Sequence, residues 1–172
     1  MTTVPVIETE RLRLRALGPQ DFEPLCAFYA SNRSSFVGGP MDPEGTWRAL
    51  ACEIGHWTLR GYGRFAVEES ETGAMCGLIG PWNPHGWPEP EIGWDLMNGF
   101  EGKGYATEAG RATRDFVYNS LGWTTAISLI ALGNDGSRGV AQRLGATMER
   151  HYTHPRFGEM EVWRHPGPEA SS

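Results

Sequence analysis

Residues 100–109, "FEGKGYATEA", join a glycine-rich loop to a run of residues that favour helix. Gly102 and Gly104 flank Lys103, so the backbone there can adopt positive φ angles and come close to another molecule. The helix expected to follow presents unpaired N–H groups and a partial positive charge at its start. Both features favour the binding of an anion at this position. The stretch therefore predicts a phosphate-binding loop at a helix N-terminus.

Two common phosphate-binding loops match this stretch poorly. A P-loop requires a serine or threonine directly after its Gly-Lys pair, whereas Gly104 follows Lys103 here. A dinucleotide fingerprint requires a third small residue and an early βαβ unit, whereas Thr107 holds that position and the loop lies in mid-chain. A nucleotide-dependent enzyme stays open as an alternative. The pyrophosphate of coenzyme A is the third candidate ligand.

The length of the chain and its net charge narrow the class of protein. A chain of 172 residues and 19.0 kDa suits one domain, which we expect over residues 1–166, with a disordered tail over 167–172. The net charge of −6 argues against a nucleic-acid or membrane-surface partner, because both require a basic patch. Cys26, Cys52 and Cys76 form no C-x-x-C motif. We expect buried, unpaired thiols in a reducing cytoplasm.

Hydrophobic periodicity predicts the order β α α β β β α β α β β, an α/β or α+β domain around one mixed sheet. Strands are expected at residues 9–17, 64–69, 74–80, 91–97 and 123–132, with a closing hairpin within 147–165. Helices are expected around residues 22–29, 43–57, 105–117 and 137–144. In the second helix, Asp42 is placed to cap the start, and Trp47, Leu50, Ile54 and Trp57 are expected to pack inward.

Three segments together resemble a known family. They are "ETERLRLRAL" (8–17), "EIGWDLMNGFEGKGYATEA" (91–109) and "NDGSRGVAQRLGA" (134–146). Their order and separation resemble the GNAT superfamily of N-acetyltransferases, and more narrowly its RimJ/RimL-like branch of ribosomal-protein acetyltransferases. The resemblance implies a single GNAT domain. Its mixed, mostly antiparallel sheet would have about six to seven strands and about four flanking helices. The sheet would splay between the strands at 91–97 and 123–132.

The resemblance also implies acetyl-CoA as cosubstrate, without a metal. Strand backbone at Trp94, Asp95 and Leu96 and the side chain of Asn134 would bond the pantetheine arm. The loop amides would hold the pyrophosphate; they belong to Gly102, Lys103, Gly104, Tyr105, Ala106 and Thr107. The family pattern begins with Gln or Arg, whereas this chain has Glu101, which we expect to point outward.

Acetyl transfer to an amine requires a base for the amine and a proton donor for the leaving thiolate. Similar enzymes often have a carboxylate at the start of this strand, so the resemblance implies Glu91 as the candidate base, acting directly or through water. His85 is the rival, since its ordinary pKa of ~6.5 suits that role. Many relatives use a tyrosine as acid, but this chain has none between Tyr118 and Tyr152. Ser137 is the available hydroxyl, and it is also expected to cap its helix.

The acceptor pocket is expected near the loop "PWNPHGWPEP" (81–90). Trp82, Trp87 and His85 lie among prolines and glycines there, and they are the candidate substrate-binding residues. Acidic side chains near the cleft would favour a cationic amine; the candidates are Glu69, Glu89 and Glu91.

The sequence thus predicts an acetyl-CoA-dependent N-acetyltransferase that acts by direct attack in a ternary complex. Its acceptor would be a primary amine, either on a peptide or protein N-terminus or on a small molecule. A non-catalytic acyl-CoA-binding or sensor protein of the same fold stays open as an alternative. A homodimer also stays open, because many proteins of this kind form dimers.

Overall fold

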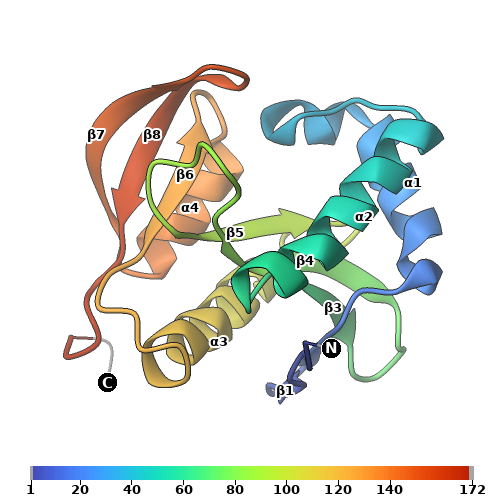
Figure 1. The fold of residues 1–172 in the computed structure, drawn as a ribbon, viewed down its shortest axis with the longest axis horizontal. Helices are drawn as coiled ribbons and strands as arrows, with labels where there is room; N and C mark the ends of the chain where they lie inside the picture. Colours follow the sequence, from blue (N-terminus) through green and yellow to red (C-terminus); the bar gives the residue numbers. More distant parts are fainter. Residues whose placement is uncertain (1, 171–172) are drawn as a thin grey trace.

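A computed structural model describes residues 2–170 as one sheet with helices packed around it (Figure 1). The strands are β1 (Ile7–Glu8), β2 (Leu12–Arg15), β3 (Phe65–Glu69), β4 (Met75–Trp82), β5 (Glu91–Leu96), β6 (Ile127–Ala131), β7 (Thr147–His154) and β8 (Gly158–Arg164). The α-helices are α1 (Phe22–Ala30), α2 (Pro43–Arg60), α3 (Tyr105–Asn119) and α4 (Asp135–Arg143). Two 3₁₀ helices, η1 (Pro19–Asp21) and η2 (Asn32–Val37), flank α1.

The sheet runs in the order β1-β2-β3-β4-β5-β6-β8-β7 and is antiparallel except between β5 and β6. In that parallel pair only Glu91 and Ile127 are in register, and beyond them the two strands separate. The mixed sheet, its splay and the closing hairpin are confirmed. The expected count of six to seven strands is low by at least one, because the two-residue β1, which pairs with β2, is too short to show a pattern.

Helix α2 confirms one local prediction and contradicts another. The Asp42 side chain caps it by accepting from the Gly45 N–H over 2.8 Å. Trp57 is buried and donates to the Arg64 carbonyl over 2.9 Å. However, Trp47 is 63% exposed and Ile54 42% exposed, so their assignment to the core is wrong. The helix lies on the surface of the sheet and turns only one face inward.

Helix α3 packs against β4 and β5 and fixes the direction in which the glycine loop points. Its Tyr105 and Ala109 join the core of β2, β3 and β4. Trp94 of β5 is half-buried and packs against separate apolar clusters at the splay. The packing of Trp94 against these clusters therefore holds β5 in place beside its gap with β6.

The cysteines and the C-terminal residues differ in part from what the sequence predicts. All three thiols are unpaired, but only Cys76 is buried, so the expectation of burial is wrong for the exposed Cys52 and the half-buried Cys26. Residues 167–170 form a turn in which the Ala170 N–H reaches the Gly167 carbonyl over 3.1 Å. Residues 171–172 of the expected tail lie outside the described residues. Within residues 2–170, no helix is long and apolar enough to cross a membrane.

Candidate active site

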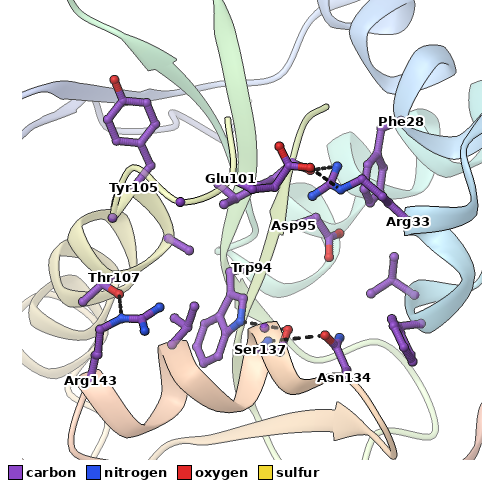
Figure 2. A pocket seen from close by; sticks show the side chains of 18 residues that line it. Phe28, Arg33, Trp94, Asp95, Glu101, Tyr105, Thr107, Asn134, Ser137 and Arg143 are labelled. Carbon is purple, nitrogen blue, oxygen red and sulfur yellow. Dashed lines mark hydrogen bonds and ion pairs between the residues drawn. The ribbon is translucent and has the colours of Figure 1, made fainter. Parts of the chain in front are cut away.

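Two adjoining cavities open where β5 and β6 separate. The loop cavity, of about 520 Å³, is bounded by the glycine loop and by α4 (Figure 2). The aromatic cavity, of about 680 Å³, is bounded by α2, the 81–90 loop and the β7–β8 turn. Both are lined by the same set of residues at their meeting point: Phe36, Val37, Trp94, Asp95, Asn134 and Ser137. We call this meeting point the junction.

The glycine loop leaves the start of α3 open to the loop cavity. Gly102 and Gly104 have φ angles of +78° and +81°, which other residues adopt only with strain. Gly104 is the N-cap and supplies no side chain to bond the first N–H groups of the helix. A Cβ on Gly102 would meet no atom within 4 Å, so nothing in the fold fills that space. The geometry suits an anion bound by backbone amides.

The structure separates Lys103 from the other loop residues. Gly102, Gly104, Tyr105, Ala106 and Thr107 line the loop cavity, and so do Trp94, Asp95, Leu96 and Asn134. Lys103 does not line it: its Nζ lies 3.6 Å from a Glu69 carboxylate oxygen and 5.1 Å from the centre of the Phe100 ring. In this structure the Lys103 side chain is thus engaged by Glu69 and Phe100 rather than by the loop cavity.

Glu101 faces the loop cavity, but it is paired. Its carboxylate lies 2.5 Å from Arg33 Nε (Figure 2). It also accepts from the Gly99 N–H over 2.8 Å. The Arg33 guanidinium also donates to the Leu96 carbonyl and to Asn98 Oδ1, each over 2.9 Å. The prediction that Glu101 points outward is therefore wrong. Its carboxylate lies at the cavity wall, where the ion pair with Arg33 offsets its negative charge.

A second arginine, Arg143 of α4, was not found by sequence reasoning. Its exposed side chain lines the loop cavity, and its Nε donates to Thr107 Oγ1 over 3.1 Å (Figure 2). Among residues 2–170, no carboxylate forms an ion pair with it. Its place in the last turn of α4 is the only local signal. A free guanidinium beside open amides adds to the attraction for an anion.

At the junction, Asn134 caps α4 in place of Ser137, which was expected to do so. Asn134 caps α4, because its Oδ1 accepts from the Ser137 N–H over 3.3 Å. The prediction that Ser137 is the N-cap is therefore wrong. Ser137 Oγ instead accepts from Trp94 Nε1 over 3.3 Å, which leaves its O–H free to donate toward the junction. Asn134 likewise keeps its amide NH₂ available.

Glu91 lies in the aromatic cavity and is only 6% exposed. One carboxylate oxygen accepts from the Leu129 N–H over 2.8 Å and the other from Trp87 Nε1 over 2.9 Å. Burial raises the pKa of Glu91 to about 7, although these two hydrogen bonds pull it down. A fixed carboxyl group with this pKa can accept a proton near neutral pH.

The three predicted acceptor residues line the aromatic cavity together. Trp82 stacks on His56, with ring centres 4.4 Å apart. Trp87 meets His154 edge-on at 5.0 Å, and His85 is exposed at the rim.

Two of the three acidic residues expected near the cleft do not line it. Glu69 binds Tyr105 and Thr72, and Glu89 pairs with Arg164. Their expected role at the acceptor cleft is therefore wrong.

Sequence reasoning did not find a cluster of charged side chains that lines the aromatic cavity. Arg64, which precedes β3, bonds Glu53 of α2 and donates to Asp95 Oδ2 over 2.9 Å. Its guanidinium also lies 4.9 Å from the centre of the Trp82 ring. Burial raises the pKa of Glu53, and Arg64 opposes that rise. The partners come from distant parts of the chain, so no local pattern could have joined them.

Comparison with known proteins agrees with this geometry. Residues 11–147 match the family described as "Acetyltransferase (GNAT) domain". The crystal structure of an acetyltransferase from Agrobacterium tumefaciens str. C58 is 36% identical, with a TM-score of 0.87 over 95% of each chain. The putative ribosomal N-acetyltransferase YdaF of Bacillus subtilis (strain 168) is 28% identical, covering 79% of this chain and 78% of that one. RimL, a ribosomal L7/L12 α-N-protein acetyltransferase solved with coenzyme A, shares the fold at 17% identity and a TM-score of 0.76, over 93% of this chain and 97% of that one.

Proposed function

Because this chain belongs to the GNAT acetyltransferases, in their RimJ/RimL-like branch, we propose that it transfers the acetyl group of acetyl-CoA to a primary amine. It is an acyltransferase. One observation carries the proposal: the loop cavity and the aromatic cavity meet at Trp94 and Ser137, with open amides on one side and Glu91 on the other. A donor and an acceptor can thus reach one point from opposite directions.

Members of this family use acetyl-CoA, which supplies a thioester that an amine can attack. The open N–H groups at Gly102–Thr107 would hold its pyrophosphate, assisted by Arg143. The free NH₂ of Asn134 and the β5 backbone at Trp94 and Asp95 would bond the pantetheine arm. The Leu96 carbonyl already accepts from Arg33, so an arm group bound there would share that oxygen.

The chain's own side chains then divide the proton transfers. Glu91 takes a proton from the entering ammonium group, which frees the nitrogen lone pair for attack on the thioester carbonyl. As the C–N bond forms and the C–S bond breaks, Ser137 Oγ–H would give its proton to the leaving sulfur and take up the second proton that the nitrogen loses, so the serine would end as a hydroxyl again. Because no covalent acetyl-enzyme is needed, the route requires no nucleophile from the protein. The exposed His85 would act at the entrance rather than at the reacting nitrogen.

The expected setting of this chemistry is the cytoplasm, whose reducing conditions suit three unpaired cysteines. The donor is tested by thermal unfolding with acetyl-CoA, CoA, NADH and ATP at equal concentrations. A ligand at about 100 times its Kd adds ~2.7 kcal/mol of stability, enough to raise the Tm by a few degrees. We expect a shift with the CoA ligands alone.

Transfer is tested next by thiol release with a library of peptide and small-molecule amines. Release that depends on an amine, with one acetyl group added to it by mass spectrometry, is the expected result. A larger thermal shift with NADH or ATP would contradict the donor. Binding of acetyl-CoA without transfer to any amine would contradict the reaction.

A further inference from the structure

The floor of the aromatic cavity carries more negative than positive charge. Glu53, Glu91 and Asp95 line it and are 4%, 6% and 6% exposed. Among the described residues of the cavity, one guanidinium lies with them at low exposure, that of Arg64, whose side chain is 12% exposed. Arg64 bonds Glu53 and Asp95. Glu91 has no ion-pair partner in the described part of the cavity and accepts hydrogen bonds from two neutral N–H groups. The deep end of the cavity therefore favours a cation such as an ammonium group.

The rim of the same cavity has the opposite sign. Arg48 of α2 and Arg156 of the β7–β8 turn line the cavity and are exposed. Within residues 2–170, Arg156 forms no ion pair, and its guanidinium lies 5.1 Å from the centre of the Phe157 ring. Arg48 pairs with Glu44 over 2.6 Å, but both side chains are more than 70% exposed (73% and 74%). Water screens such a pair, so a ligand can replace it.

The two arginines come from two different elements that line the same cavity, α2 and the β7–β8 turn. In Figure 1 the β7–β8 hairpin, at the upper left, and α2, toward the right, are separate parts of the fold. Phe157, next to Arg156, comes so close to Gly38 that a Cβ there would lie 3.1 Å from its ring. The turn is thereby seated against the loop that leads into α2, and Arg156 stays at the mouth of the cavity.

Resting on the proposed function, we propose that the acceptor is an amine whose own chain carries an anionic group. The ammonium end binds the acidic floor at Glu91, and a carboxylate binds Arg48 and Arg156 at the rim. Arginine suits this role because its planar guanidinium pairs with a carboxylate through two parallel hydrogen bonds. A polyamine would instead place a second positive charge against the two arginines.

The cavity volume of about 680 Å³ falls within the range of small-ligand sites, so it has room for more than the reacting amine. Two sources share the required chemistry: the N-terminus of a peptide with acidic residues at its second and third positions, and a free amino acid with a side-chain carboxylate. Both carry an ammonium group and a carboxylate a few bonds apart.

The test compares two peptides that differ only at their second and third residues, which are Asp in one and Lys in the other. Free glutamate and spermidine form a small-molecule pair. Binding to the CoA-loaded protein is measured by calorimetry, and kcat/KM for transfer is measured in parallel. We expect the acidic peptide to bind about tenfold or more tightly than the basic one. The preference should weaken as salt is added.

Arg48→Gln together with Arg156→Gln should remove most of that preference and leave the Kd of acetyl-CoA unchanged. Arg150→Gln is the matched control, because Arg150 lies on the same hairpin but pairs with Glu89 outside the cavity. Comparing glutamate with the acidic peptide distinguishes a small-molecule acceptor from a peptide acceptor. The inference is supported if either of them binds more tightly than its basic counterpart.

The inference would be overturned if neither acidic probe binds more tightly than its basic counterpart, that is, if the acidic peptide does not exceed the lysine peptide and glutamate does not exceed spermidine. A preference that survives the double substitution would overturn it as well. These outcomes are distinct from failure of the proposed function. If the acidic peptide binds more tightly through Arg48 and Arg156 but receives no acetyl group, the binding inference stands and the transfer proposal fails.

Discussion

The Glu91 carboxylate accepts the backbone N–H of Leu129 over 2.8 Å, across the point where β5 and β6 separate. In a continuous parallel pair, a β5 carbonyl would bond this amide. The side chain takes that place and closes the narrow end of the splay. The same carboxylate is thereby held still in the aromatic cavity. The residue that we assign as base is thus fixed by the feature of the sheet that creates the site.

Ser137→Ala tests the assigned proton donor. Removing the hydroxyl should lower kcat by about 10²-fold, the low end for general acid catalysis, because a thiolate with a pKa of ~8.5 leaves with limited help. The Kd of acetyl-CoA should change little. Steady-state kinetics and calorimetry measure the two quantities. A donor thioester with a more acidic thiol should reduce the loss in kcat.

The same substitution has a built-in structural control. Asn134 caps α4 through the backbone N–H of residue 137, and alanine keeps that N–H. The cap is therefore kept, and the variant should lose only the hydrogen bond from Trp94 Nε1, at a cost of about 1 kcal/mol of stability. An unchanged kcat in a stable Ser137→Ala protein would show that the hydroxyl does not supply the proton.

The ion pair between Arg33 and Glu101 predicts a pattern in cofactor affinity. Arg33→Ala leaves the Glu101 carboxylate unpaired beside the expected phosphate site, so the Kd of acetyl-CoA should rise by about tenfold. Glu101→Ala alone should not weaken binding. The double variant should recover most of the affinity, as calorimetry can measure. If Glu101→Ala itself weakens binding, Glu101 contacts the cofactor directly.

His165 predicts a loss of stability in acid. It is 3% exposed, and its Nε2 lies 2.8 Å from Ser128 Oγ. Burial lowers the pKa of His165 to about 3, and Arg114 and Arg164 add to this effect. The unfolded chain takes up the proton near pH ~6.5. The contribution of His165 is thus fully present above that pH and is lost as pH falls toward 3, at up to about 1.4 kcal/mol per pH unit.

Denaturant unfolding of wild type and His165→Gln at several pH values measures this slope as a difference. The comparison is needed because Glu91 acts in the opposite direction. Its folded pKa of about 7 exceeds the ordinary value of 4.5, so its contribution declines as pH rises between them. Subtracting the His165→Gln curve cancels that effect. A difference that does not vary with pH would mean that His165 has the same pKa in the folded and unfolded chain, contrary to the effect of burial.

Sequence reasoning was sound where the structure depends on neighbouring residues. The Asp42 cap and the glycine loop are set by local backbone and side-chain rules, and both are present. Sequence reasoning was wrong where two nearby residues could each take the same position in a helix cap. Asn134 and Ser137 are both good caps, and the point at which β6 ends decides between them. Trp47 fits an apolar pattern, yet it lies on the outer face of α2.

Pairs that form across the fold could not be predicted in this way. Arg33 and Glu101 meet only because η2 lies beside the glycine loop. Arg64 joins α2 to β5 through Glu53 and Asp95, and none of the three stands near another in the sequence. Tertiary packing determines such contacts, so the polarity of the aromatic cavity becomes visible only in the structure.

The most direct test of the account is the pH dependence of kcat/KM for wild type and Glu91→Gln, with a peptide amine as acceptor. In the wild type, kcat/KM should rise with pH through an apparent pKa near 7, as Glu91 loses its proton. Glu91→Gln should lose about 10²-fold or more, and its remaining activity should follow the acceptor amine, at a pKa of about 8. A Glu91→Gln profile that matches the wild type in height and midpoint would contradict the assignment of Glu91 as the base.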